Sequence, residues 1–245
     1  MSPRLTLNTA ARILRQLRHD RRTIALVLVV PTLLLTILRY LYDNQPLVFD
    51  RIGLIMLGVF PFVIMFLLTS VAMLRERTSG TLERLLTTPI HKVDILLGYG
   101  LAFAIAATVQ AIVVSTLAYW LLGLDTMGEQ WLVAMIAVGN SVLGMALGLF
   151  VSAFANSEFQ AVQFMPAFVL PQALLCGLLV PREQMAGWLQ AISDVLPMSY
   201  AVEALTEVGR FADPTDTLWR DIAIIVGCIL LALLAGAATL RRRTA

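Results

Sequence analysis

The stretch RERTSGTLERLLTTPIHK occupies residues 75–92, between two long apolar runs. Six of its residues are charged, in a chain that has only 18 Lys and Arg and 16 Asp and Glu. Gly80 interrupts the preceding run, and Pro89 ends the helical pattern because proline disfavours the α region for the residue before it. The pattern predicts a short charged helix held between two apolar segments. A solvated loop with lipid-facing leucines is the alternative interpretation.

Composition identifies the class of protein around this stretch. Hydrophobic residues make up 59% of the 245 residues and charged residues 14%, whereas soluble domains average about 45–50% apolar and about 25% charged. The chain is therefore an integral membrane protein. Because the sequence has no alternating strands, its spans are predicted to be helical. We expect an all-α, polytopic membrane protein with one domain over residues 1–245.

Six runs come close to the ~20 apolar residues that cross a bilayer as a helix. They cover residues 24–42, 53–74, 95–122, 131–153, 158–180 and 218–239. The first run follows a basic stretch and could imitate a signal peptide. Its long apolar core and the lack of a small-residue cleavage site favour a retained first helix. Six spans place both termini on one side of the membrane.

Basic residues define the orientation of these spans, because cytoplasmic segments of membrane proteins are enriched in Lys and Arg. Most of the 18 basic residues fall on one side of the six-span arrangement, while the loops at 43–51, 123–130 and 181–217 lean acidic. The basic residues on that side are Arg4, Arg12, Arg15, Arg18, Arg21, Arg22, Arg75, Arg77, Arg84, Lys92, Arg241, Arg242 and Arg243. The sequence therefore predicts that both termini and the stretch at 75–92 are cytoplasmic.

Residues 1–23 show an amphipathic helical pattern of their own. One predicted face carries Leu7, Ala10, Ala11, Leu14 and Leu17, and the other carries Arg4, Asn8, Arg12, Arg15 and His19. This pattern favours a helix on the inner membrane surface whose arginines reach anionic headgroups. A basic anchor without ordered helical structure is the alternative.

The sequence contains few residues of the types that form catalytic or metal-binding sites. Cys176 and Cys228 lie in apolar runs and are expected to pack, and His19 and His91 lack neighbouring ligands at metal spacing. The sequence contains no GxxxxGK[ST] motif before its single lysine, Lys92. We therefore expect no catalytic residue, no metal and no ATPase site in the chain.

Polar residues inside the spans are mostly neutral amides. Gln110, Asn140, Gln163 and Gln172 are predicted to tie helices together rather than to move protons. The segment GMALG at 144–148 allows helices to approach closely, and contact within the subunit is its favoured use over a dimer contact. Because the interior polar residues are neutral, the energy for any transport is expected to come from elsewhere than ion coupling in this chain.

Two segments resemble the ABC-2 type permeases, the membrane subunits of a class of ATP-driven exporters. ERTSGTLERLLTTPIHKVDILLGY matches their acidic residue, Gly-Thr-Leu-Glu run and Thr-Pro turn after the second span. GLLVPREQMAGWLQAISDVLPMSYAVEALTEV matches the Gly, Pro, Trp-Leu and Leu-Pro spacing near their carboxyl end. With the six spans and the basic first helix, the resemblance covers essentially the whole chain.

The resemblance implies a half-transporter that pairs with a second permease, either a copy or a sister chain. Each permease would rest a coupling helix, within residues 75–92, on a cytoplasmic ABC ATPase that binds ATP and Mg. The residues implied in coupling are Glu76, Gly80, Thr81, Glu83, Arg84, Thr88 and Pro89. The second and fifth spans would line the path, with Phe60, Phe62, Met65, Phe66, Phe164, Met165 and Phe168 as candidates. Lipid contact or helix packing is the alternative role of each path residue.

The same resemblance implies short helices that dip into the outer leaflet before the last span, within 181–217. The residues that mark this re-entrant segment are Gly177, Pro181, Trp188, Pro197 and Tyr200. An ordinary outer loop with Trp188 and Tyr200 as interface anchors is the alternative.

The candidate path is rich in Phe and Met, which suits a lipophilic cargo such as a drug, an antibiotic or a lipid. Together with this cargo class, the resemblance implies an exporter in a bacterial-type inner membrane that moves its cargo out of the cytoplasm or the inner leaflet. Polysaccharide or glycolipid export is the alternative within the family. A membrane-embedded lipid-modifying enzyme and a structural scaffold are the alternatives outside it.

Overall fold

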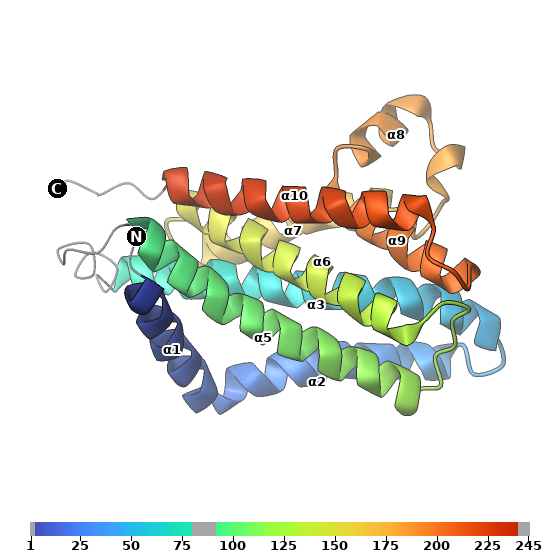
Figure 1. Cartoon of the computed structure of the whole chain (residues 1–245), viewed down its shortest axis with the longest axis horizontal. Coiled ribbons are helices and arrows are strands. Elements are labelled where there is room, and N and C mark those ends of the chain that lie inside the picture. Colours follow the sequence, from blue (N-terminus) through green and yellow to red (C-terminus); the bar gives the residue numbers. More distant parts are fainter. Residues whose placement is uncertain (1–2, 80–91, 240–245) are drawn as a thin grey trace.

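The computed structural model describes residues 3–79 and 92–239, and every regular element in these ranges is a helix (Figure 1). The elements are α1 (Pro3–His19), α2 (Arg21–Leu41), α3 (Pro46–Thr78), α5 (Lys92–Trp120), α6 (Gln130–Val151), η1 (Ser152–Phe154), α7 (Glu158–Leu175), η2 (Arg182–Gln184), α8 (Gly187–Ser193), α9 (Pro197–Arg210) and α10 (Asp216–Thr239). The all-α, polytopic architecture is confirmed.

Five helices of the described residues are long and apolar enough to cross a membrane. These candidate spans are Arg21–Leu41, Pro46–Thr78, Leu97–Trp120, Gln130–Phe154 and Asp216–Thr239. The expected sixth span at 158–180 falls on α7, which has 18 residues and is not among the five. Its length corresponds to about 27 Å at ~1.5 Å per residue, close to the ~30 Å of a hydrocarbon core. A sixth span therefore remains a prediction.

The carboxyl end of α7 differs from the sequence-based boundary. The helix ends at Leu175 rather than near residue 180, and Gly177 has a φ of 95°. A residue with a side chain rarely adopts this left-handed conformation, whereas glycine does so readily. The chain therefore turns away from the bundle at Gly177 and enters the segment that contains η2 and α8.

Helices α3 and α6 form the centre of the bundle, and most of their side chains are buried. Two glycines let these helices touch backbone to backbone. A Cβ added to Gly144 would lie 2.3 Å from the carbonyl oxygen of Phe62, and one added to Gly148 would lie 2.4 Å from that of Phe66. The prediction that GMALG makes a close contact within the subunit is confirmed.

Amide side chains connect neighbouring helices inside the bundle. Asn140 of α6 donates to the carbonyl oxygen of Gly58 in α3 at 2.9 Å, and Gln110 of α5 donates to that of Val27 in α2 at 2.9 Å. The predicted role of these two amides as ties between helices is confirmed. Gln163, by contrast, is exposed on α7.

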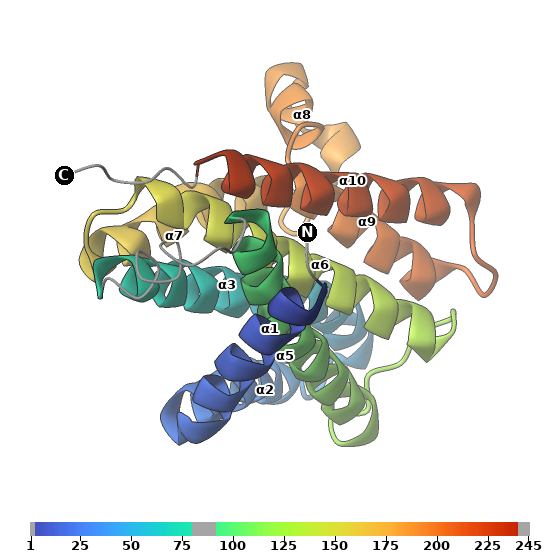
Figure 2. The same ribbon diagram turned by 60° about the vertical axis from the view of Figure 1, so that its left-hand side comes forward.

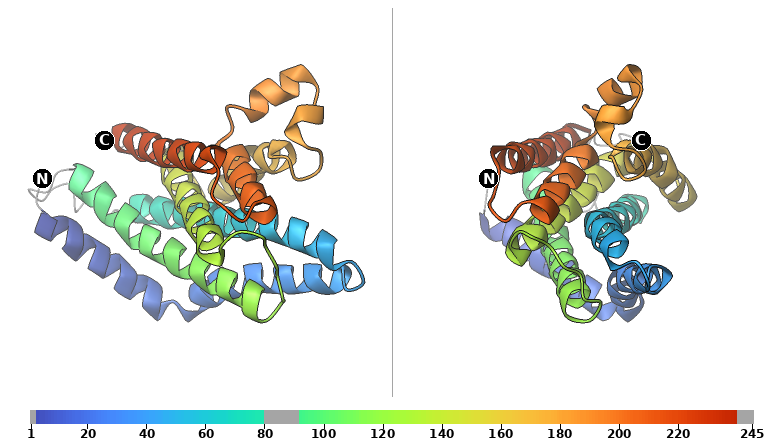
Figure 3. Two further views of the ribbon diagram at one scale, coloured as in Figure 1. Left: turned by 45° about the vertical axis from the view of Figure 1, so that its right-hand side comes forward. Right: turned by 90° about the vertical axis from the view of Figure 1, so that its right-hand side faces the viewer.

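The views in Figures 2 and 3 show two features outside this centre. Helices α1 and α2 meet in an elbow, and α1 leans across the beginning of α5. Helix α8 stands away from the bundle on the side of α7 and α10. Figure 1 places the start of α1, the start of α5 and the end of α10 at the same end of the molecule, which we call the basic end. The opposite end, which holds α9 and the start of α10, is the outer end.

Helix α1 confirms a helical amino-terminal segment, but its buried face is rotated from the predicted one. Thr9, Ala10 and Ile13 are buried, whereas Leu7 and Ala11 are exposed. The reason is the close approach of Gly98 in α5, where an added Cβ would lie 2.7 Å from the Cβ of Thr9. The helical pattern alone contained no information about this partner.

Candidate functional site

The end of α3 leads into the stretch at 75–92 that the sequence singles out. Glu76 lies in the last turns of α3, which ends at Thr78, and α5 begins at Lys92. The other predicted coupling residues lie outside the described residues: Gly80, Thr81, Glu83, Arg84, Thr88 and Pro89. The structure therefore shows the two helices that carry this stretch and the contacts made at its first residues.

Glu76 belongs to a cluster that joins three helices. Nη1 of Arg12 in α1 lies 3.9 Å from Oε1 of Glu76, and Nη2 of Arg12 donates to the hydroxyl of Tyr99 in α5 at 2.7 Å. The guanidinium carbon also lies 5.8 Å from the centre of the Tyr99 ring, within cation–π distance. Arg12, which the sequence suggested would reach lipid headgroups, thus fixes α1 to the base of α3 and α5.

Neighbouring residues connect the same end of α3 to α7 and η1. Nε and Nη2 of Arg75 donate to the two carboxylate oxygens of Glu158 at 2.8 and 3.0 Å. Nη1 of Arg77 donates to the carbonyl oxygen of Ser152 at 2.8 Å. Ion pairs as exposed as Arg75 with Glu158 contribute only about 0–1 kcal/mol each. Together these contacts connect this end of α3 to α1, α5, η1 and α7.

Three of the predicted path residues, Phe66 of α3 with Phe164 and Phe168 of α7, form an aromatic cluster. Met65 lies apart from them, because it packs with residues of α1, α5 and α6. Phe62, Met65 and Phe66 are fully buried, and Phe168 is 42% exposed. The ring centres of Phe66 and Phe168 are 6.4 Å apart, and those of Phe164 and Phe168 are 6.3 Å apart. The members with intermediate burial are Phe60, Phe164 and Met165. Within one chain, the α3 side chains face the interior and Phe168 reaches the surface.

The residues of the predicted re-entrant segment lie at the outer end. Pro181 precedes η2, Trp188 is 67% exposed on α8, and Pro197 is the first residue of α9. The hydroxyl of Tyr200 donates to the carbonyl oxygen of Asp194 at 2.6 Å, so α9 holds the end of α8. Both helices are short and separated by turns, and the re-entrant arrangement stays a prediction.

An ionic network at the outer end was missed from the sequence. Arg182 pairs with Asp194 and with Glu203 of α9, while Arg220 of α10 lies 3.2 Å from Glu203 and 2.8 Å from Asp221. The Asp221 side chain is fully buried. An ionisable residue within an apolar span is a signal of such a network, and Asp221 lies inside the predicted span 218–239. We call these five residues the outer ionic network.

These features define the class: a polytopic α-helical membrane protein with a central α3–α6 pair, a charged connection at its basic end and a separate outer segment. Residues 4–208 match the family model described as ABC-2 type transporter, and the chain belongs to that family. An ABC-2 permease is a transport protein of the membrane and is not itself an ATPase. In this family the ATP is generally bound by a separate ATPase subunit.

Individual relatives are more distant. The chain is 28% identical over 158 residues to the probable multidrug ABC transporter permease YbhR of Escherichia coli. The aligned region covers 64% of this chain and 42% of the relative. It is 25% identical over 146 residues to the linearmycin resistance permease protein LnrN of Bacillus subtilis, covering 59% and 38%. It is 28% identical over 179 residues to nodulation protein J of Neorhizobium galegae, covering 69% and 64%. The chain thus matches about two fifths of the length of the two permeases.

Proposed function

We propose that this chain is the membrane subunit of an ABC exporter that moves a lipophilic drug, antibiotic or lipid-like cargo out of the cytoplasm or the inner leaflet. The observation that carries this proposal is the aromatic cluster between α3 and α7. Phe168 of this cluster is 42% exposed and offers an apolar surface to a cargo, and the buried Phe66 beside it would become accessible if α3 moved against α7. The names of the multidrug and linearmycin relatives support the same cargo class.

The proposed drive comes from a separate cytoplasmic ABC ATPase, which holds ATP and Mg. Its contact would be the segment that continues from Glu76, with Glu83 and Arg84 as charged docking residues. The contacts of Arg12, Arg75 and Arg77 support this role, because they connect the base of α3 to four other elements. Closure of the ATPase would then move α3 against α7 and separate the Phe66–Phe168 contact.

The proposed assembly contains two permeases, as a homodimer or with a sister chain. Helix α7 supports this arrangement because one side of it is apolar and uncovered in the described chain. Its exposed side chains include Phe159, Val162, Leu170 and Leu174. The basic end would face the cytoplasm of a bacterial-type inner membrane, and α7 would be the sixth span.

Transport in a purified system tests the proposal. The native complex, isolated with its ATPase, is reconstituted into liposomes, and ATP-dependent movement of lipophilic dyes and of a glycolipid is compared. We expect dye movement that Phe168→Ala reduces at least about tenfold, whereas Phe154→Ala, an exposed phenylalanine on η1, leaves it near wild type. Movement of the glycolipid alone would contradict the assignment of cargo class.

A further inference from the structure

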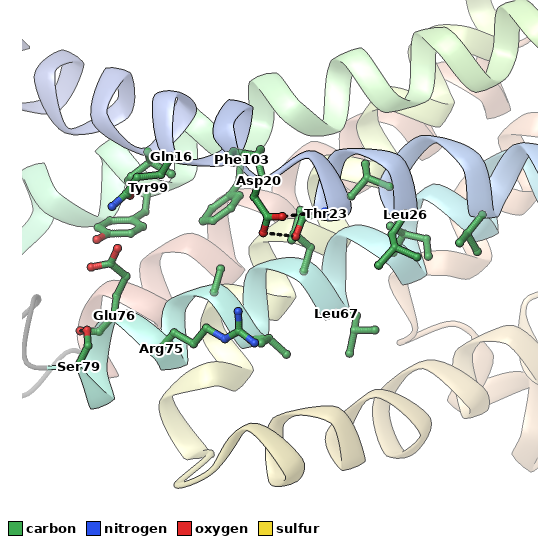
Figure 4. A pocket seen from close by; sticks show the side chains of 18 residues that line it. Gln16, Asp20, Thr23, Leu26, Leu67, Arg75, Glu76, Ser79, Tyr99 and Phe103 are labelled. Carbon is green, nitrogen blue, oxygen red and sulfur yellow. Dashed lines mark hydrogen bonds between the residues drawn. The ribbon is translucent and has the colours of Figure 1, made fainter.

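A cavity of about 780 Å³ lies between the α1–α2 elbow and one side of α3 (Figure 4). Its described lining does not include Phe62, Phe66 or Phe168, so it is separate from the proposed cargo path. Its volume falls within the ~300–1,000 Å³ of known small-molecule sites. We call it the elbow groove.

The walls of the elbow groove are apolar stripes on two candidate spans. Helix α2 contributes Leu26 and Val30, and α3 contributes Leu67 and Val71. Within each helix these residues are four apart, so they share one helical face. Leu26 is 61% exposed, which leaves the groove accessible from the side. Walls of this kind at membrane depth fit an acyl chain.

The polar end of the groove carries both signs of charge on opposite walls. Asp20, between α1 and α2, accepts hydrogen bonds from the hydroxyl and the backbone N–H of Thr23 at 2.6 and 3.1 Å. These bonds, the hydroxyl first, hold the pKa of Asp20 below its usual value, so the carboxylate is charged at neutral pH. Arg75 lies across the groove on α3, and its side chain is 63% exposed even though it pairs with Glu158 (Figure 4).

We propose that the elbow groove binds a zwitterionic phospholipid from the adjacent leaflet. Its acyl chains lie between α2 and α3, its ammonium group lies beside Asp20, and its phosphate lies beside Arg75. An anionic headgroup matches this pair less well, because Asp20 would repel its second charge. The bound lipid would join the elbow to the residue at which the 75–92 stretch begins.

Tryptophan quenching by brominated lipids tests this site without transport or an ATPase. Leu67→Trp places an indole in the groove wall, and Leu230→Trp, a position 56% exposed on α10, is the control on the lipid-facing surface. Each is reconstituted with brominated phosphatidylethanolamine or brominated phosphatidylglycerol at equal mole fraction. The parent protein supplies the background of the four native tryptophans.

At Leu67→Trp we expect quenching by the zwitterionic lipid to be about threefold stronger than quenching by the anionic lipid. A preference of this size corresponds to the free energy of a weak surface ion pair. At Leu230→Trp we expect equal quenching by the two lipids. Adding Asp20→Asn with Arg75→Gln should abolish the preference at Leu67→Trp and leave Leu230→Trp unchanged. If the double substitution fails to fold, the comparison in the native background decides alone. Equal quenching by both lipids at Leu67→Trp would overturn the proposal. Absence of quenching there would also overturn it, because protein, such as a second permease, would then fill the groove.

Discussion

Asn140 shows how a single polar side chain stabilises an apolar bundle. Its side chain is fully buried in α6, and its amide donates to the carbonyl oxygen of Gly58 in α3. Lipid offers an amide no hydrogen-bond partner, so a bond between helices is expected to stabilise a membrane protein. The measured contributions of such bonds to stability average about 0.6 kcal/mol, with a maximum near 1.7. The bond is therefore a modest stabilising contact that also fixes how α3 and α6 face one another.

Replacing this amide tests its contribution. We expect Asn140→Ala to lower the free energy of unfolding by about 0.5–2 kcal/mol, through the lost bond and a small cavity. Gln163→Ala removes an exposed amide from α7 and should change it by less than about 0.5 kcal/mol. Unfolding of the purified protein in mixed micelles measures both. Equal losses would show that Asn140 does not act as a tie.

At the outer end, Arg182 also connects separate elements through its side chain. It pairs with Asp194 and Glu203 and thereby joins the α8 segment to α9. Hydrogen bonds to charged groups contribute about 1.5–3 kcal/mol each, and partial exposure reduces this. We expect Arg182→Met to increase hydrogen exchange in residues 187–196 at least about tenfold, while Arg51→Met, an exposed arginine at the same end, leaves it unchanged. Unaltered exchange in Arg182→Met would mean that the outer ionic network does not hold α8.

At the scale of helices, the α3–α6 contact depends on glycine. Gly148 approaches the carbonyl oxygen of Phe66 and the hydroxyl of Thr69 so closely that a methyl group has no room, whereas the nearest atom to a Cβ at Gly139 is 3.7 Å away. Gly148→Ala should therefore destabilise the protein by about 1–3 kcal/mol through overpacking. Gly139→Ala should be neutral or stabilise by up to about 1 kcal/mol, since alanine favours helix. Thermal unfolding in detergent gives both values, and equal effects would contradict this packing.

Most helices could be predicted from the sequence, because a long apolar run indicates a membrane helix whatever that helix packs against. The role of the interior amides could be predicted for a similar reason, because an amide inside a span needs a hydrogen-bond partner on some neighbouring helix. The face of α1 could not be predicted, since it is set by contact with Gly98 some ninety positions away. The end of α7 at Leu175 depends on the conformation of Gly177, and the outer ionic network depends on pairs such as Arg182 with Glu203. These features arise from tertiary contacts that local patterns do not contain.

For the whole molecule, the number of membrane spans can be determined by experiment. If α7 crosses the bilayer, residues just before and after it lie on opposite faces. In a background without Cys176 and Cys228, Glu183→Cys should react with a membrane-impermeant maleimide on intact cells. Ser157→Cys should react only after permeabilisation. Reaction of both from the same face would show that α7 enters and leaves on one side, which leaves the five spans found by hydropathy.

The central claim is that the 75–92 stretch docks an ATPase on the basic end. Glu83, in the middle of that stretch, lies outside the described residues, and its role is tested by charge reversal. The complex is purified from membranes through the permease, and the ATPase retained by wild type, Glu83→Arg and Asp213→Arg is quantified. Asp213 is exposed at the outer end and serves as the control.

The account predicts that wild type and Asp213→Arg retain equal amounts of ATPase. Glu83→Arg should lose at least about nine tenths of it, as expected when an interfacial ion pair of ~2–5 kcal/mol is broken. Retention by Glu83→Arg equal to that of wild type, in a protein that still inserts into the membrane, would contradict the assignment of this stretch as the coupling site.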